Sequence, residues 1–168
     1  DADAFRSMGL DRRQALWETS ALSDRPVGMF QGQPSASATE APIQLPKMTA
    51  SEHVLQDYSS MSLSLKAHPV SFVRKHLFAG GILCTKELDL WPDGTPVRVA
   101  GLVLVRQRPG TASGICFITI EDETGSANLV VFKDLFDKYR KEIVRSRLLM
   151  VEGKLQREGE VTHEIGRA

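Results

Sequence analysis

The spacing of apolar and polar residues changes near residue 97, and this change divides the chain into a helical part and a strand-rich part. Before this point, apolar residues recur every three or four positions in short stretches, which is the period of an amphipathic helix. After it, β-branched and other apolar residues form short runs separated by turn residues, as in strands. These runs predict strands at Val97–Gln107, Ser113–Glu121, Gly125–Phe132 and Arg147–Gln156, with a fifth beginning at Glu160.

A helix is predicted within the strand-rich part, over Asp134–Ile143, between the third and fourth strands. The whole chain is thus α+β, and three strands, a helix and two strands are typical of the OB fold, a five-stranded barrel. Gly101 suits this fold, because the first strand of such a barrel bends sharply. An SH3-like barrel is the main alternative, but it does not usually carry a helix here. The chain lacks an initiator Met and stops at Ala168, so we expect a piece of a longer protein with a truncated last strand.

The helical part begins with two short helices followed by a linker. The first helix is expected at Ala4–Met8, and the second opens at Asp11, whose side chain suits an N-cap. Residues 23–46 contain four prolines and a run of small polar residues. Such a segment buries too little apolar surface to offset its conformational entropy, so a flexible linker is expected.

Two further helices are predicted between the linker and the strands. Thr49 and Glu52 form a T-x-x-E capping box for a helix from residue 50 to about residue 58. His68 and Pro69 open the next helix, which ends at the Gly80–Gly81 pair. The expected segments are the end of a helical module at 1–22, the linker at 23–46, a helical connector at 47–96 and the barrel at 97–168.

Composition narrows the classes of protein that the chain can represent. Hydrophobic residues make up 42% and charged residues 25%, as in ordinary soluble proteins, and no apolar run approaches the ~20 residues that a membrane-spanning helix needs. The net charge is zero, and residues 97–168 hold 12 Lys and Arg against 10 Asp and Glu, which supports a local basic groove at most.

Cys84 and Cys116 stand in apolar surroundings, which predicts reduced, buried thiols and a cytoplasmic location. The Cys and His residues lack the paired spacing of a zinc site.

The stretch from Val97 to Phe132 carries a more specific pattern. It reads VRVAGLVLVRQRPGTASGICFITIEDETGSANLVVF. This closely resembles the OB domain of bacterial C-family (DnaE-type) DNA polymerases, in which an apolar strand ending in V-A-G leads through a basic loop to E-D-x-T-G and a strand ending in V-V-F. The residues at the matching positions are Gly114, Phe117, Glu121, Asp122, Thr124, Gly125 and Phe132.

Two upstream stretches extend this resemblance to nearly the whole chain outside the linker. Met48–Arg74 is similar to the segment that joins the helix-hairpin-helix region of the family to its OB domain, with D-Y and H-P-x-x-x-x-R features. Ala4–Glu18 is similar to the last part of the tandem helix-hairpin-helix module. LDRRQALW together with RQRPGTASGICFITIEDETG is most similar to the error-prone, damage-inducible branch, which implies a DNA polymerase that performs translesion synthesis.

The resemblance also implies what this piece lacks. The catalytic palm of the family, which uses Mg²⁺ for nucleotidyl transfer, has no counterpart in these residues, so no catalytic or metal-binding residue is expected here. The acidic run Glu121–Glu123 lies at a strand end, and Asp122 is expected to bond the backbone of the following turn. Two metal ions would need carboxylates that converge on one point, whereas consecutive strand residues alternate faces.

Single-strand binding by an OB fold needs cations for phosphates and flat side chains for bases. The candidate residues are Arg106 and Arg108 in the first loop, Lys154 and Arg157 near the last loop, Phe117 and Asn128 on the strands, and Arg12 and Arg13 at the start of the second helix. Each has a structural alternative. Phe117 packs in the core in that alternative, because Ile115–Ile120 is apolar on both faces, while Asn128 and the arginines are simply solvated.

Three functions fit these observations. The first is a nucleic-acid-binding C-terminal region of an error-prone polymerase, whose OB domain guides the single-stranded template during damage-induced mutagenesis. The second is an OB module that docks protein partners, for which the resemblance implies accessory mutasome proteins and the sliding clamp. The third is an unrelated OB protein that binds single strands, against which the match at Met48–Arg74 argues.

Overall fold

The computed structural model describes residues 4–22, 43–110, 114–158 and 161–166, of which 21–22, 157–158 and 161–166 are described by their backbone alone. The predicted linker therefore lies outside the described residues between 23 and 42, as do Ser113, Glu160 and Ala168. The chain divides into two compact units, residues 1–66 and residues 67–168, and each is described by itself. Among the described residues, no helix is long and apolar enough to cross a membrane.

Unit 1 consists of short helices. One turn of 3-10 helix, η1, spans Arg6–Met8 and ends at Gly9 with a φ of 76°, where the sequence predicts a helix over residues 4–8. Helix α1 follows over Arg12–Leu22, and α2 spans Ala50–Met61, three residues beyond the predicted end. The predicted capping box is confirmed: the Thr49 side chain accepts from the backbone N–H of Glu52, whose carboxylate accepts from the Thr49 N–H in return.

Unit 2 begins with short helices that pack against the strands. The 3-10 turn η3 spans Pro69–Phe72, helix α3 spans Arg74–Ala79 and the 3-10 helix η4 spans Thr85–Leu90. The predicted helix after His68 therefore forms as two consecutive pieces, and the His68 ring accepts from the N–H of Val70 at its start. The chain turns away at Gly81, whose φ of 73° suits glycine.

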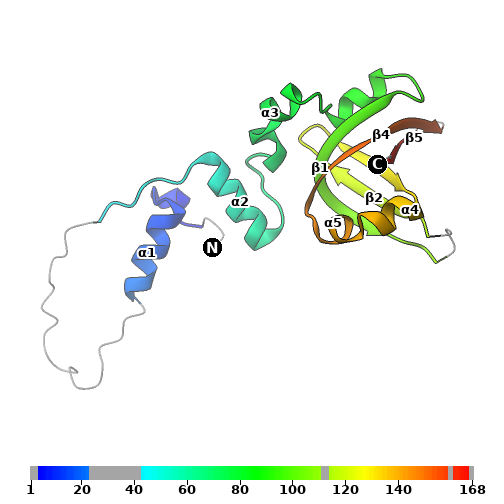
Figure 1. Cartoon of the computed structure of the whole chain (residues 1–168). Coiled ribbons are helices and arrows are strands. Elements are labelled where there is room, and N and C mark those ends of the chain that lie inside the picture. The colour runs from blue at the N-terminus through cyan, green and yellow to red at the C-terminus, as the bar shows by residue number, and fades with distance from the viewer. Residues whose placement is uncertain (1–3, 23–42, 111–113, 159–160, 167–168) are drawn as a thin grey trace, which may run out of the picture. The chain divides into compact units, whose positions relative to one another are not determined.

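The strands of unit 2 form a strongly curled sheet (Figure 1). The element bounds are β1 at Pro96–Gln107, β2 at Cys116–Glu121, β3 at Ser126–Val131, α4 at Lys133–Lys138, α5 at Arg140–Arg145, β4 at Leu148–Glu158 and β5 at Val161–Gly166. The neighbour order β1-β2-β3-β5-β4 closes on itself; β3 and β5 run parallel and the other pairs run antiparallel. A curled sheet with helices between β3 and β4 is an OB fold.

Strand β1 serves both sides of the barrel, which explains its length. Its first half pairs with β4 and its second half with β2, and Leu102 takes part in both pairings. Gly101 stands at this exchange, and a Cβ there would lie 2.7 Å from the carbonyl oxygen of Glu121. Only glycine allows the two backbones to approach so closely, in agreement with the bend expected at this residue.

The helical segment after β3 differs from the single helix that the sequence predicts. Helices α4 and α5 are separated at Tyr139, which has a φ of −112° and a ψ of 28°. Neither glycine nor proline occurs at the break, so the sequence carries no signal for it. Phe136 from α4 and Ile143 from α5 both enter the core, and Figure 1 shows the two helices together at one end of the barrel.

The core lies inside the barrel and is built from alternate strand residues. The residues of β2 alternate between buried and more exposed positions along its length, and those of β3 do the same. The strand residues of the core cluster are Val97, Val99, Cys116, Ile118, Ile120, Ala127, Leu129, Val131 and Leu155. Cys116 is buried as predicted and Cys84 only half-buried, and both are free thiols. Burial raises the pKa of both thiols.

Candidate nucleic-acid interface

The outer face of β1, β2 and β3 combines an aromatic ring with polar groups. We call this surface the sheet face; its residues are Val105, Gln107, Phe117, Thr119, Asn128 and Val130. Phe117 points out of the barrel because its neighbours Cys116 and Ile118 point in, and it is 39% exposed. Thr119 lies opposite Asn128, and its hydroxyl donates to Asn128 Oδ1 at 2.9 Å. The sheet face thus presents a flat apolar ring beside hydrogen-bonding side chains.

Two cations lie at the end of the sheet face where β2 begins. The Arg108 guanidinium lies 4.4 Å from the centre of the Phe136 ring and donates to the Gly114 carbonyl at 3.3 Å. The aliphatic part of Lys133 approaches the same glycine, since a Cβ there would lie 3.2 Å from two Lys133 carbons. Gly114 stands three residues before Phe117. Arg108 and Lys133 therefore form what we call the basic rim of the sheet face.

The sequence favours a purely structural role for two residues at the start of α4 that the structure places at the surface. Lys133 belongs to a charged helix, and such charge runs usually form only a solvated face. Phe132 ends a strand, where an aromatic residue usually packs inward, yet it is 45% exposed. Their positions depend on how β3 passes into α4, and no local pattern carries that information.

Arg106 has a different environment from Arg108, although the two stand two residues apart. Its Nε donates to the carbonyl oxygen of Ile143 at 2.6 Å, and its Nη2 donates to the carbonyl oxygen of Ser146. These acceptors are at the end of α5, so the guanidinium ties β1 to the segment that leads into β4. The structure brings only Arg108 of this pair to the basic rim.

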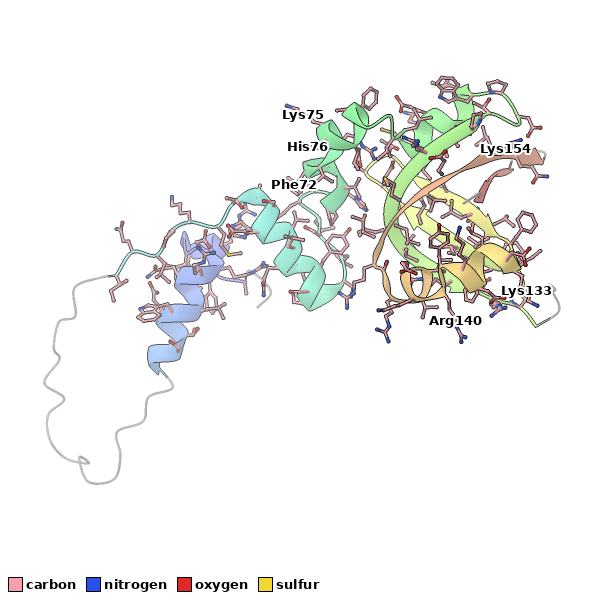
Figure 2. The ribbon with its side chains drawn as sticks, in the orientation of Figure 1. Phe72, Lys75, His76, Lys133, Arg140 and Lys154 are labelled. Atoms are coloured by element: carbon pink, nitrogen blue, oxygen red, sulfur yellow. The ribbon has the colours of Figure 1, made fainter. Side chains whose placement is uncertain are left out.

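The cations predicted on β4 lie elsewhere. Lys154 is opposite Pro96 at the start of β1, whereas Arg108 follows the end of β1. Figure 2 likewise shows Lys154 at a separate place on the barrel from Lys133. Arg157 belongs to β4, but its side chain is outside the described residues. Lys154 is therefore not part of the basic rim.

The two arginines predicted in the first helical part belong to unit 1. Arg12 is only 3% exposed, and it donates to Asp57 Oδ1 at 2.5 Å and to the His53 carbonyl at 3.2 Å. Arg13 is more exposed and contacts Glu52 at 3.2 Å and the Pro46 carbonyl at 3.1 Å. The Arg12 guanidinium thus holds α1 to α2, and Arg13 alone faces solvent.

Asp57 is the centre of this contact in unit 1. Besides Arg12, it accepts from the Ser64 hydroxyl at 2.8 Å and from Lys66 Nζ at 3.2 Å. Burial alone would raise the Asp57 pKa, but the hydrogen bonds from Arg12, Ser64 and Lys66 outweigh burial and lower the pKa to about 2. The carboxylate is therefore ionised whenever unit 1 is folded at neutral pH.

The acidic run at the end of β2 has the structural role that the sequence predicts. Asp122 Oδ1 accepts from the N–H groups of Thr124 and Gly125 at 2.7 and 3.1 Å, which closes the β2–β3 turn. Its oxygens also accept from the backbone and hydroxyl of Thr85 and from Arg74. Among the described residues, no three His, Cys, Asp or Glu side chains gather as a metal site requires.

Comparison with known proteins identifies relatives of the chain and of its strand-rich part. Residues 97–165 match the family model described as "OB-fold nucleic acid binding domain". The chain is 49% identical to an error-prone DNA polymerase of Sinorhizobium medicae over 98% of its own length, and 47% identical to one of a Bradyrhizobium species over 93%. It spans 15% and 14% of the length of these relatives. The resemblance to error-prone DNA polymerases is thereby confirmed.

A solved structure also matches part of the chain. It is asparaginyl-tRNA synthetase from Pyrococcus horikoshii in complex with asparaginyl-adenylate, with a TM-score of 0.43 and 25% identity. The match covers 52% of this chain and 21% of that protein.

Proposed function

We propose that this chain is the part of an error-prone DNA polymerase that holds single-stranded template DNA, and that it does so with the sheet face. Two findings support this proposal: the relatives that match the chain are error-prone DNA polymerases, and residues 97–165 match a nucleic-acid-binding OB family. The observation that carries it is the exposed Phe117 ring on β2, beside the two cations of the basic rim.

Each group of this surface has a role in binding a single strand. The Phe117 ring stacks against a base, and such stacking contributes about 1–3 kcal/mol per base without selecting its sequence. Arg108 and Lys133 attract the phosphates, which makes the affinity depend on salt. Asn128 and Thr119 offer hydrogen-bond donors and acceptors to base edges. Weak, salt-sensitive and sequence-independent binding follows from this set.

The chemistry of the whole enzyme belongs to other parts of the protein in this proposal. The parent is a DNA-directed DNA polymerase of the cytoplasm that acts in translesion synthesis and DNA repair. The Mg²⁺ that nucleotidyl transfer uses does not fit the described residues here, because the Asp122 oxygens are occupied by hydroxyl, backbone and guanidinium donors. This chain contributes the position of the template strand.

The neighbouring arginines Arg106 and Arg108 provide a direct test. Fluorescence anisotropy of a labelled thymidine oligomer would be measured with the wild-type chain and with Phe117→Ala, Arg108→Ala and Arg106→Ala. Phe117→Ala is expected to weaken binding about tenfold, and Arg108→Ala to lower the salt slope by ~0.7, the loss of about one phosphate contact.

Arg106→Ala serves as the matched control, because its guanidinium is bonded to two backbone carbonyls. It is expected to lower the melting temperature and to leave the affinity and salt slope of the folded protein unchanged. Equal affinity of the wild-type chain, Phe117→Ala and Arg108→Ala at every salt concentration would refute the proposal.

A second candidate function, docking of a protein partner, has its own observation. Apolar side chains are exposed outside the barrel on β4 and α5, namely Val144, Leu148 and Met150, the last being 66% exposed. A cavity of about 320 Å³ lies beside them and includes Leu149 and Tyr139 in its lining. Accessory mutasome proteins or the sliding clamp are the partners proposed for this surface. Met150→Glu would abolish such docking in a pull-down while leaving DNA binding intact.

A further inference from the structure

The segment η3–α3 has one face against the barrel and an opposite face in solvent. Val70 is 1% exposed, and Arg74 reaches the β2–β3 turn. On the other side, Phe72 ends η3, and Lys75 and His76 follow in the first turn of α3. Figure 2 shows these three side chains on the side of η3–α3 that faces away from the barrel. We call them the η3–α3 patch.

The η3–α3 patch is held in a fixed position relative to the barrel. The Arg74 guanidinium donates to Asp122 at 2.9 Å and to Glu123 at 3.0 Å, both in the β2–β3 turn. After α3, the N–H of Leu83 donates to the Arg98 carbonyl of β1 at 2.8 Å. Bonds on both sides of the patch therefore prevent the segment from turning its outer face elsewhere.

The chain segment that carries the patch is basic in sequence, and the carboxylates that pack against it come from the β2–β3 turn. Residues 67–86 contain three Lys or Arg and two His, and they contain no Asp or Glu. The Arg74 charge is balanced by two carboxylates, which leaves Lys75 as the cation beside the Phe72 ring. Phe72 is 40% exposed. An exposed aromatic ring beside a cation is a combination that binds the bases and phosphates of a single strand.

The patch also lies in line with the sheet face. Phe117 is near the start of β2 and Glu121 at its end, about 13 Å further on at the usual rise per strand residue. At that end, His68 Nε2 is 3.9 Å from the Glu121 carboxylate, so η3 begins where the sheet face stops. A strand that leaves Phe117 along β2 thus arrives at the η3–α3 segment.

We propose that the η3–α3 patch is a second subsite for the same DNA single strand, in which Phe72 stacks against a base and Lys75 contacts a phosphate. The subsite extends the track from the sheet face past the β2–β3 turn, and it therefore rests on the proposed function. A strand that is too short to reach the patch gains nothing from it, whereas a longer strand binds both places. Affinity then rises with length in a way that depends on Phe72 and Lys75.

The test compares thymidine oligomers of about 4, 8 and 16 nucleotides on the full 168-residue chain by fluorescence anisotropy. The double variant F72A/K75E is expected to bind the shortest oligomer like the wild type and the longest about tenfold more weakly. The single variant K75E changes only an exposed side chain and is expected to lower the salt slope for the long oligomer by ~0.7. K141E, on the exposed side of α5, is the charge-matched control and is expected to behave like the wild type.

The possible results separate the two proposals. Failure of the wild-type chain to bind any oligomer would overturn the proposed function. Binding by the wild type with the same affinities for F72A/K75E at all three lengths would overturn the second subsite and leave the sheet face standing. Loss of a protein partner from F72A/K75E with DNA affinity unchanged would also overturn the subsite, since the patch would then be a protein-docking surface.

Discussion

Each compact unit has a buried aspartate that accepts several hydrogen bonds, but the two carboxylates are held by different kinds of partner. Asp57 in unit 1 is held mainly by charged side chains, Arg12 and Lys66, with one serine hydroxyl. Asp122 in unit 2 is held mainly by neutral donors, the backbone and hydroxyls of Thr85 and Thr124, with Arg74 in addition. The stability of unit 1 therefore depends on charged side chains that are far from Asp57 in sequence. The stability of unit 2 depends on the hydrogen bonds that close the β2–β3 turn.

This difference helps to explain which arginines remain accessible at the surface. In both units, an arginine that stands far from the aspartate in sequence pairs with its carboxylate and joins two segments. The cations left at the surface are those with long contacts or ring contacts, such as Arg108. The comparison thus separates arginines that maintain the fold from those that a phosphate can reach.

The largest effect is expected for Asp122→Ala, because it removes the acceptor of six hydrogen bonds at once, two each from Thr85 and Thr124 and one each from Gly125 and Arg74. The loss of these hydrogen bonds, with the buried Thr85 donors left without their acceptor, should cost unit 2 about 4 kcal/mol of unfolding free energy. Urea titration followed by Trp91 fluorescence in a Trp17→Phe background reports on unit 2 alone.

Asp134→Ala, in the exposed first turn of α4, is the control, with an expected loss of about 0.5 kcal/mol of unfolding free energy. A loss below 1 kcal/mol for Asp122→Ala would show that the turn forms without its carboxylate.

A somewhat smaller effect is expected for Arg12→Ala in unit 1. The substitution leaves Asp57 buried with Lys66 as its one remaining charged partner, which should cost about 3 kcal/mol. The measurement is urea titration by Trp17 fluorescence in a Trp91→Phe background. Arg13→Ala is the matched control next to it in sequence, and its exposed pair with Glu52 should contribute less than about 1 kcal/mol. Equal losses for the two variants would mean that the buried pair does not hold α1 to α2.

The same comparison explains what the sequence could predict. The Asp122 turn and the Thr49–Glu52 capping box involve residues within three positions of each other, so local pattern was sufficient for both. The strands are predictable for the same reason, since the alternation of apolar and polar residues along a strand indicates which face is buried. Local chemistry of this kind needs no knowledge of tertiary structure.

Contacts between distant residues could not be predicted in this way. Arg12 meets Asp57 across 45 positions, and Arg106 meets Ser146 across 40, so both arginines resembled free surface cations in the sequence. Phe117 lies in a run that is apolar on both faces, and only the burial of Cys116 and Ile118 in the structure shows that it points outward. The sequence therefore proposes β2 and β3 as carriers of the candidate site, which stays a prediction, and the different environments of its arginines appear only in the structure.

The smallest of these effects is a loss of stability in acid, and it distinguishes the two aspartates once more. The pKa of Asp57 is lowered from 3.8 to about 2 in folded unit 1, so its contribution is complete above pH 3.8 and is lost as pH falls towards 2. The melting temperature of unit 1, followed by Trp17 in the Trp91→Phe background, should fall through this window. In Arg12→Ala the fall should be smaller, because the first of the hydrogen bonds that lower this pKa is gone.

The pKa of Asp122 in unit 2 is also lowered, because the hydrogen bonds from Thr124 and Thr85 outweigh its burial. Arg74→Ala should therefore leave most of the acid sensitivity of unit 2 in place. An equal reduction in both arginine variants would show that charged partners govern both carboxylates.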